Sequence, residues 1–197
     1  MTRYDIINTF VDKRNYNSFL EIGTFMGDTF SKVNCNIKSS VDPDPKCNAT
    51  YVMTSDEYFD KYNDKFDIIF IDGLHEHNQV YRDIQNGLNH LNENGTIVMH
   101  DCMPKSEKMQ LWDNKSHQNE EWTGDTWKAY YKALNEVDYN VYVVDTDYGC
   151  GVIDTSVSKK KPENYIDMEK LQYNDYLSYI NNKSYNTYNE EQFRSII

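Results

Sequence analysis

Polar, acidic and glycine residues follow five successive predicted strands, at the point where the apolar run of each strand stops. They are Glu21, Gly23 and Gly27 after the first strand, Asp42 after the second, Ser55 and Asp56 after the third, Asp72 and His75 after the fourth, and His100 and Asp101 after the fifth. In an open sheet of parallel strands, ligands bind outside the carboxyl ends of the strands. The series therefore predicts one binding site built from several strand ends, and it is hard to explain by loop composition.

The stretch FLEIGTFMGDTF spans the end of the first predicted strand and the turn that follows it. Gly23 and Gly27 allow this turn to pass close to a ligand without a side-chain clash. The next helix offers free backbone N–H groups and the Thr29 hydroxyl to a carboxylate. A carboxylate at Glu21 suits an ammonium group, and Asp42, one strand over, is placed to accept hydrogen bonds from a ribose diol. An amino-acid end at the first strand and a ribose at the second describe S-adenosylmethionine.

Competing nucleotide and nucleophile motifs fit less well. The sequence has G-x-x-x-G where a dinucleotide fingerprint needs G-x-G-x-x-G, and it has neither the G-K-[ST] of a phosphate-binding loop nor the G-x-S-x-G of a nucleophile elbow. Simpler structural explanations stay open. Glu21 and the two glycines could form a plain β–α turn with a capping acid, and Asp42 lies in an Asp-Pro-Asp-Pro segment that forms turns by itself.

The strands that position these residues alternate with helices. FDIIFIDG (Phe66–Gly73) is the clearest strand, because its unbroken apolar centre suits a strand covered on both faces. A helix over Glu76–Leu91, closed by Asn94-Gly95, precedes the strand TIVMHD. Asn140–Asp145 and Gly151–Ile153 lie too close together for a crossover helix, so we expect them to pair antiparallel. The other predicted elements are a helix over Tyr4–Asn15, strands over Ser18–Ile22, Ser39–Val41 and Tyr51–Met53, and helices over Asp125–Leu134 and Met168–Ile180. Together they predict an α/β domain with a mostly parallel sheet.

Composition narrows the class of partner. The 197-residue chain has 32 acidic and 20 basic residues and a formal charge of −12. Such a surface repels phosphate backbones, which argues against nucleic acid and anionic membranes as partners. Four cysteines without a C-x-x-C pair indicate a reducing compartment. Because neither a signal peptide nor a membrane-spanning run is visible, we expect a soluble, cytoplasmic protein, and the sequence leaves homo-oligomerisation open.

The length suits one domain, which we place at residues 1–155, with residues 156–197 as a polar, tyrosine-rich C-terminal extension packed on it. EWTGDTWKAYYKAL (Glu121–Leu134) follows a polar loop of the length of an active-site lid. Trp122 and Trp127 could wall an acceptor pocket, although helical spacing favours a core position for Trp127. The role of Lys128 stays open.

Four motifs in order, EIGTFMGDT, VDPDP, FIDGLHEHNQVYRDI and GTIVMHD, resemble the class I S-adenosylmethionine-dependent methyltransferases. Within them the chain is most similar to the branch shared by catechol-type and macrolide-sugar O-methyltransferases, over most of its length from Phe19 to Ile153. The resemblance implies a Rossmann-like α/β fold with a seven-stranded, mostly parallel sheet, an antiparallel last strand and helices on both faces. It implies S-adenosylmethionine as the cofactor and is less specific for the acceptor.

The resemblance also implies roles for particular residues. Those at the cofactor would be Glu21, Gly23, Thr24, Gly27 and Thr29 at the methionine end, Asp42 at the ribose, Ser55 and Asp56 at the adenine, and Asp72 after the fourth strand. In metal-dependent members the positions that match Asp72, His100 and Asp101 bind a divalent cation. The His-Asp pair departs from the two acids, or acid and amide, that are usual there. Because hard Mg²⁺ prefers oxygen ligands, this departure leaves Mn²⁺ or no metal open.

We therefore predict transfer of a methyl group to a hydroxyl of a small molecule or sugar. His75 matches the general base of the sugar-modifying members, and its neutral form near pH 7 suits proton abstraction. Alternatively, a metal at Asp72 and Asp101 would acidify the hydroxyl, or His100 and Asp101 would form a purely structural pair. We expect His77 at the surface. Two other functions stay open: a different doubly wound, NAD-dependent enzyme, and a methyltransferase-like module that binds cofactor without turnover.

Overall fold

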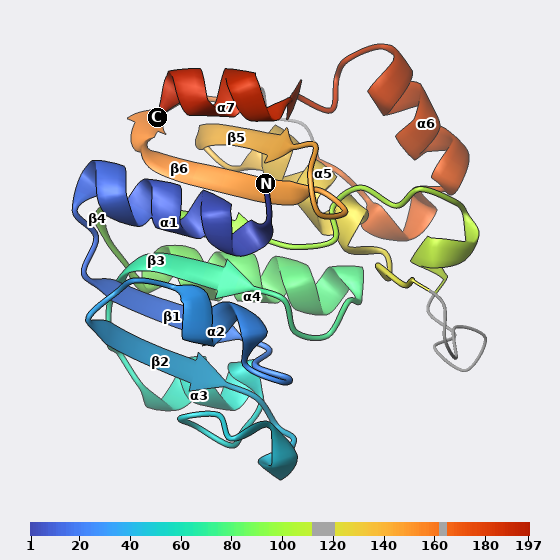
Figure 1. Ribbon diagram of the computed structural model, residues 1–197. Coiled ribbons are helices and arrows are strands. Elements are labelled where there is room, and N and C mark those ends of the chain that lie inside the picture. The colour runs from blue at the N-terminus through green and yellow to red at the C-terminus, as the bar shows by residue number, and fades with distance from the viewer. Residues whose placement is uncertain (112–120, 162–164) are drawn as a thin grey trace.

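A computed structural model describes residues 1–111, 121–161 and 165–197 of the chain. Its centre is a seven-stranded sheet in the order β2-β1-β3-β4-β6-β5-β7 (Figure 1). The strands are β1 (Ser18–Ile22), β2 (Ile37–Val41), β3 (Phe66–Ile71), β4 (Leu91–Met99), β5 (Tyr139–Val144), β6 (Cys150–Ser158) and β7 (Thr187–Tyr188). Only β6 runs antiparallel to its neighbours, β4 and β5. The predicted α/β fold with an antiparallel strand over Gly151–Ile153 is confirmed.

Helices cover both faces of the sheet (Figure 1). The helices are α1 (Arg3–Arg14), α2 (Asp28–Lys32), α3 (Ser55–Lys61), α4 (His77–Asn89), α5 (Thr126–Glu136), α6 (Tyr173–Asn181) and α7 (Glu190–Ile196). On one face α3, α4, α5 and α6 pack on side chains such as Ile69 and Ile97. On the other, α1, α2 and α7 pack on side chains such as Phe70 and Val98. The alternating side chains of β3 and β4 thus enter two different cores, which explains their unbroken apolar runs.

Several elements differ from the sequence prediction. The strand predicted at Tyr51–Met53 is reduced to a single bridge between Val41 and Tyr51, and the sheet gains β7 from the C-terminal segment instead. The helix predicted to be closed by Asn94-Gly95 already ends at Asn89, and those two residues lie inside β4. They sit where the β3–β4 register shifts, with Asn94 at a φ of 61°. An Asn-Gly pair can therefore mark an irregular start of a strand as well as the end of a helix.

The predicted helix over Met168–Ile180 is divided into a 3₁₀ turn at Met168–Lys170 and the helix α6. Part of the lid-length loop predicted before Glu121 falls on residues 112–120, outside the described residues. None of the helices within the described ranges has the length and apolarity that crossing a bilayer requires.

Candidate active site

A cavity of about 680 Å³ opens at the carboxyl ends of β1, β2, β3 and β4. Its wall contains most of the predicted site residues: Glu21, Gly23, Thr24, Thr29, Asp42, Ser55, Asp72, His75, His100 and Asp101. Two predicted cofactor residues, Gly27 and Asp56, lie outside this wall. Gly27 is the N-cap residue before α2 and has a φ of 73°, and the Asp56 side chain, half exposed, pairs with Arg82 at 3.6 Å. The parallel order of these strands brings together residues from Glu21 to Asp101 at one sheet edge.

The turn after β1 has no room for a side chain at Gly23. Its φ is +89°, and a Cβ there would lie 2.1 Å from the backbone oxygen of Asp72. At Gly27, φ is +73° and an added Cβ would meet nothing within 4 Å. The first glycine is therefore required by the close approach of β1 to the end of β3, and the second only by its backbone conformation.

Asp42 holds this turn as well as lining the cavity. Its Oδ2 accepts hydrogen bonds from the backbone N–H groups of Thr24 and Phe25, both at 3.0 Å. Its Oδ1 accepts from the N–H of Asp44 at 2.9 Å. Among the described residues, Oδ1 accepts only this one backbone hydrogen bond and has a second lone pair, so acceptor capacity is left for a ligand hydroxyl. Turn formation and a site at the ribose are thus compatible roles for one side chain.

Glu21 is a buried carboxyl with an unsatisfied atom. The residue is 1% exposed, and its Oε2 has no hydrogen-bond partner among the described residues. Burial, together with the nearby charge of Asp72, raises the pKa of Glu21 to about 8. Thr24 Oγ1 is a second buried polar atom of the cavity wall without a partner in the described part of the chain. Buried polar atoms are rarely left unpaired, so these two mark where a polar ligand group fits.

At the far end of the cavity, Ser55 lies at the start of α3 and Gln79 on α4. Gln79 Nε2 donates to Ser55 Oγ at 3.2 Å and to Asp56 Oδ1 at 3.1 Å. Gln79 is itself part of the cavity wall and was not predicted from the sequence. The α3 and α4 N-termini are therefore tied together beside the region predicted to hold adenine.

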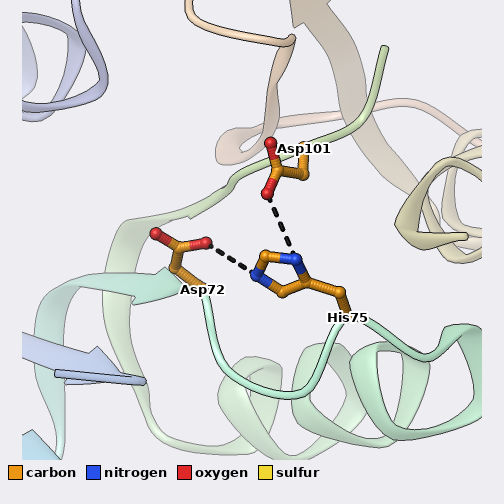
Figure 2. A group of neighbouring side chains, drawn as sticks. All are labelled: Asp72, His75 and Asp101. Atoms are coloured by element: carbon orange, nitrogen blue, oxygen red, sulfur yellow. Dashed lines mark hydrogen bonds and ion pairs between the residues drawn. The ribbon is translucent and has the colours of Figure 1, made fainter. Parts of the chain in front are cut away.

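His75 lies between two carboxylates from different strand ends, as Figure 2 shows. Its Nε2 is 3.2 Å from Asp72 Oδ1, and its Nδ1 is 3.3 Å from Asp101 Oδ2. Burial lowers the pKa of His75, but the hydrogen bond to Asp72 and the charge of Asp101 outweigh it, so the pKa is raised above 6.5. Asp101 has a φ of 59°, a strained backbone for a residue other than glycine. Such strain next to a paired histidine is typical of functional sites.

His100 contacts the same two carboxylates as His75. Its Nδ1 lies 3.4 Å from Asp72 Oδ1 and 3.3 Å from Asp101 Oδ1, and its Nε2 lies 3.5 Å from Asp147 Oδ1. Burial opposes a charge on this ring, but Asp72 and Asp101 outweigh burial and raise the pKa of His100 well above its usual value. The predicted pairing of His100 with Asp101 is present, with Asp72 and Asp147 as further partners.

Arg3 and Asp147 complete this network, and neither was predicted from the sequence. Arg3 Nη1 lies 3.2 Å from Asp147 Oδ2 and 3.3 Å from His100 Nε2. Arg3 Nε donates to Thr29 Oγ1 at 3.0 Å and lies 3.9 Å from Asp72 Oδ2. Arg3 starts α1 and Asp147 is in the β5–β6 turn, both far in sequence from the motifs, so spacing could not reveal them.

The segment just before α5 also contacts His75. Trp122 stacks on the His75 ring with centroids 4.9 Å apart and an angle of 21°. Gly124 has a φ of +57°, and a Cβ there would lie 2.0 Å from the His75 backbone oxygen. That oxygen accepts a hydrogen bond from the N–H of Asp125 at 3.1 Å. Trp122 therefore lines the cavity, as the sequence suggested, and the turn after it fits tightly against His75.

The expectation for His77 was wrong. The residue is 6% exposed, with its Nδ1 2.7 Å from Asp125 Oδ2 and its Nε2 3.3 Å from Glu169 Oε1. A histidine at a helix start is usually exposed, but here the turn before α5 and the C-terminal segment cover it. Trp127 is fully buried, which confirms its predicted core position. Lys128 pairs with Asp125 at 3.3 Å.

A divalent cation does not fit this cluster well. Asp72, His75 and Asp101 do bring two carboxylate oxygens and an imidazole nitrogen within 4.8 Å of one another, a donor set that Mn²⁺ accepts. However, both carboxylates already contact the rings of His75 and His100, and the Arg3 guanidinium lies 3.9 Å from Asp72. A cation would have to displace these contacts and sit beside a permanent positive charge.

S-adenosylmethionine, by contrast, fits the residues present. Glu21 and Thr24 line the cavity, and Glu21 Oε2 and Thr24 Oγ1 have no hydrogen-bond partner among the described residues. Asp42 lies on the adjacent strand end, and Ser55 with Gln79 lies beyond it. Ammonium, ribose and adenine groups each have a chemically matching partner along one cavity.

Comparisons with known proteins agree with this fold. A family model described as a methyltransferase domain matches residues 45–102. An O-methyltransferase from Bacillus cereus in complex with S-adenosylhomocysteine is similar with a TM-score of 0.56 at 14% identity, covering 77% of this chain and 80% of that one. A Podospora anserina methyltransferase bound to S-adenosylhomocysteine gives 0.52 at 15% identity, covering 77% of each chain.

The O-methyltransferase TomG from Streptomyces achromogenes, solved with S-adenosylmethionine, gives a TM-score of 0.55 at 10% identity, covering 80% of each chain. A search among curated proteins gave no significant match. Similarity at these identities shows the fold, and the family match covers residues 45–102 of the chain. The chain therefore has the fold of class I S-adenosylmethionine-dependent methyltransferases, and its residues 45–102 match a methyltransferase-domain family model.

Proposed function

We propose that the protein transfers a methyl group from S-adenosylmethionine to a hydroxyl group of a small molecule or sugar. The observation that carries the proposal is that His75, held by Asp72 and Asp101, lies in the wall of the same cavity as Glu21, Gly23 and Asp42. A candidate base and a candidate cofactor cradle therefore share one space. The Streptomyces relative is involved in tomaymycin synthesis, which supports a small-molecule acceptor by analogy.

The cofactor would be held by the chain's own polar groups. Glu21, ionising as it binds, would accept hydrogen bonds from the ammonium group, and Thr24 and Thr29 would contact the methionine end. Asp42 would accept from the ribose, and Ser55 would lie by the adenine, with Asp56 supporting through Gln79. S-adenosylmethionine supplies an electrophilic methyl group on a positively charged sulfur. Most of the rate would come from holding the acceptor oxygen in line with that group.

His75 would remove the acceptor proton. Its Nε2 hydrogen-bonds to Asp72, whereas its Nδ1 has no hydrogen-bond partner among the described residues, so Nδ1 is the atom that would take the proton. The acceptor hydroxyl would enter between His75 and Asp101. As the O–H proton moves to His75, the oxygen forms a bond to the methyl carbon, the carbon–sulfur bond breaks, and S-adenosylhomocysteine leaves. Asp72 and Asp101 would stabilise the imidazolium that results.

No divalent cation takes part in the proposed reaction. Positively charged side chains already surround Asp72 and Asp101, and a histidine base does not need a metal to acidify the hydroxyl. A metal would become necessary only if His75 proved dispensable.

Calorimetric titration with S-adenosylhomocysteine tests the cofactor, and a methyl-transfer assay over a panel of hydroxylated and amine-bearing small molecules tests the reaction. We expect micromolar binding and methylated oxygen in the product, identified by NMR. His75→Gln should retain the binding and lose turnover by about 10²–10⁴-fold. Absence of S-adenosylhomocysteine binding would refute the proposal, and methylation confined to amines would refute its O-specific part.

A further inference from the structure

Arg3 is an arginine inserted into an acidic cluster at the carboxyl edge of the sheet. Its side chain is 29% exposed and reaches from the start of α1 over the β5–β6 turn. The backbone N–H of Arg3 donates to Asp147 Oδ2 at 2.9 Å, and its guanidinium contacts the same carboxylate at 3.2 Å. This double contact fixes both ends of the residue, so the position of its charge is built into the fold.

Each of three carboxylates in this cluster has positively charged or imidazole partners within 4 Å. Asp72 contacts Arg3, His75 and His100, at 3.9, 3.2 and 3.4 Å. Asp101 contacts His75 and His100, both at 3.3 Å, and Asp147 contacts Arg3 and His100 at 3.2 and 3.5 Å. A carboxylate cluster normally needs cations to hold it together, and here the chain provides them.

The sequence resemblance placed a divalent cation at Asp72, His100 and Asp101. In the structure, a cation at Asp72 and Asp101 would take the place of ring contacts with both histidines and would lie close to the Arg3 guanidinium. An arginine cannot lose its charge to relieve that repulsion, because its pKa lies above about 12. The positive charges present at the cluster therefore disagree with the divalent cation that the resemblance implied.

We propose that Arg3, with the His100 ring, takes the place of a divalent cation at this cluster, so that the site operates without bound metal. Arg3 acts as a positioning residue: it holds Asp147 and Asp72, and through Asp72 the His75 ring. This inference rests on the proposed function for its meaning in catalysis, but the exclusion of metal is a property of the chain that can be measured without an acceptor.

The test is Mn²⁺ binding, followed by the electron paramagnetic resonance signal of free Mn²⁺, with the full chain alone and saturated with S-adenosylhomocysteine. Arg3→Gln removes the charge and keeps hydrogen-bonding atoms, whereas Arg3→Lys keeps the charge. Lys13→Gln is the matched control, because it removes an exposed positive charge from the same helix. We expect weak Mn²⁺ binding by the wild type, Arg3→Lys and Lys13→Gln, and at least about tenfold tighter binding by Arg3→Gln.

Tight binding of one Mn²⁺ by the wild type, lost in Asp72→Asn, would overturn the proposal, as would equal affinities of Arg3→Gln and the wild type. If Arg3→Gln does not fold, the wild type alone provides the test. Weak Mn²⁺ binding and full activity after EDTA treatment would support the proposal, whereas tight Mn²⁺ binding or loss of activity after EDTA treatment would overturn it. Failure of S-adenosylhomocysteine to bind would instead refute the proposed function, and Mn²⁺ titration of the ligand-free chain would still test the role of Arg3.

Discussion

At the residue scale, the glutamate that ends β1 makes sense as a ligand group rather than as a structural acid. Its Oε2 has no partner in the described structure, and burial raises its pKa to about 8. A capping acid in a plain β–α turn would have its oxygens satisfied by backbone N–H groups, as Asp42 has. Glu21 therefore costs stability in the free protein, and a bound ammonium group would offset that cost.

The loss of folding stability caused by burying Glu21 increases with pH. The unfolded chain releases the Glu21 proton above about pH 4.5, but the folded protein holds it until about pH 8. Stability is therefore lost as pH rises through that window. We therefore expect the difference in the free energy of unfolding between Glu21→Gln and the wild type to shift in favour of the variant by at least about 1 kcal/mol from about pH 5 to about pH 9.

Urea unfolding at the two pH values measures the Glu21 effect, with Glu93→Gln in the exposed start of β4 as the control. The same Glu21 variant should bind S-adenosylhomocysteine about 10- to 100-fold more weakly, because a charged hydrogen bond is lost. A stability difference that does not change with pH would contradict the raised pKa, and unchanged affinity would contradict the ammonium site.

The two glycines of the β1–α2 turn give a matched pair of substitutions. Gly23→Ala would place a Cβ 2.1 Å from the Asp72 backbone oxygen, whereas Gly27→Ala meets no atom within 4 Å. Both residues have positive φ, so both variants bear some backbone strain, on the order of 1 kcal/mol. We expect Gly23→Ala to lower S-adenosylhomocysteine affinity by at least about 100-fold and Gly27→Ala by less than about tenfold. Calorimetry on the folded variants measures this, and similar losses in both would show that the contact with Asp72 is unimportant.

At the element scale, the loop between β3 and α4 is held by the turn before α5. The His75 backbone oxygen accepts from Asp125 N–H, His77 N–H donates to Asp125 Oδ1 at 2.9 Å, and Gly124 packs directly on His75. The base is thus positioned by two elements that are far apart in sequence. A displacement of about 1 Å at a reacting group can cost about 10²-fold in rate.

We therefore expect Gly124→Ala to lower turnover by at least about tenfold, because its Cβ would overlap the His75 backbone oxygen at 2.0 Å. S-adenosylhomocysteine affinity should change by less than about twofold, since the cofactor end of the cavity is untouched. Gly87→Ala is the control in α4, where the nearest atoms to an added Cβ are side-chain carbons, Ile97 Cδ1 at 3.1 Å and Ile69 Cδ1 at 3.7 Å. Steady-state rates together with calorimetry separate the two effects. Equal turnover in both variants would argue against positioning by Gly124.

These elements also show what sequence could and could not provide. The central strands were predictable because β1, β3 and β4 have apolar runs that end in polar residues, and these ends supplied Glu21, Asp72, His75 and Asp101. The end of β2 supplied Asp42. Arg3 and Asp147 were not, because they reach the site only through the tertiary packing of α1 and the β5–β6 turn. β7 was missed because two residues, Thr187 and Tyr188, have no periodicity to detect.

At the scale of the whole molecule, the C-terminal segment completes the sheet and contributes to both of its cores. β7 pairs in parallel with β5 through Val143–Thr187 and Val144–Tyr188. The Tyr185 hydroxyl, fully buried, donates to the Cys102 backbone oxygen at 2.7 Å, just beyond the end of β4. The division of the chain at residue 155 stays a prediction, but these contacts lead us to expect that the two parts unfold together.

Phe193 of α7 tests this cooperativity. It is fully buried, and its ring lies 5.8 Å from that of Phe10 on α1, the helix that also carries Arg3. Phe193→Ala should cost about 3–5 kcal/mol through the cavity it leaves, in one unfolding transition for the whole chain. Ile196→Ala, at a position 46% exposed on the same helix, should cost less than about 1 kcal/mol. Urea unfolding followed by far-ultraviolet circular dichroism and by tryptophan fluorescence measures both. Because the tryptophans lie in residues 1–155, a loss of stability seen by circular dichroism alone would mean that the C-terminal segment unfolds separately from residues 1–155.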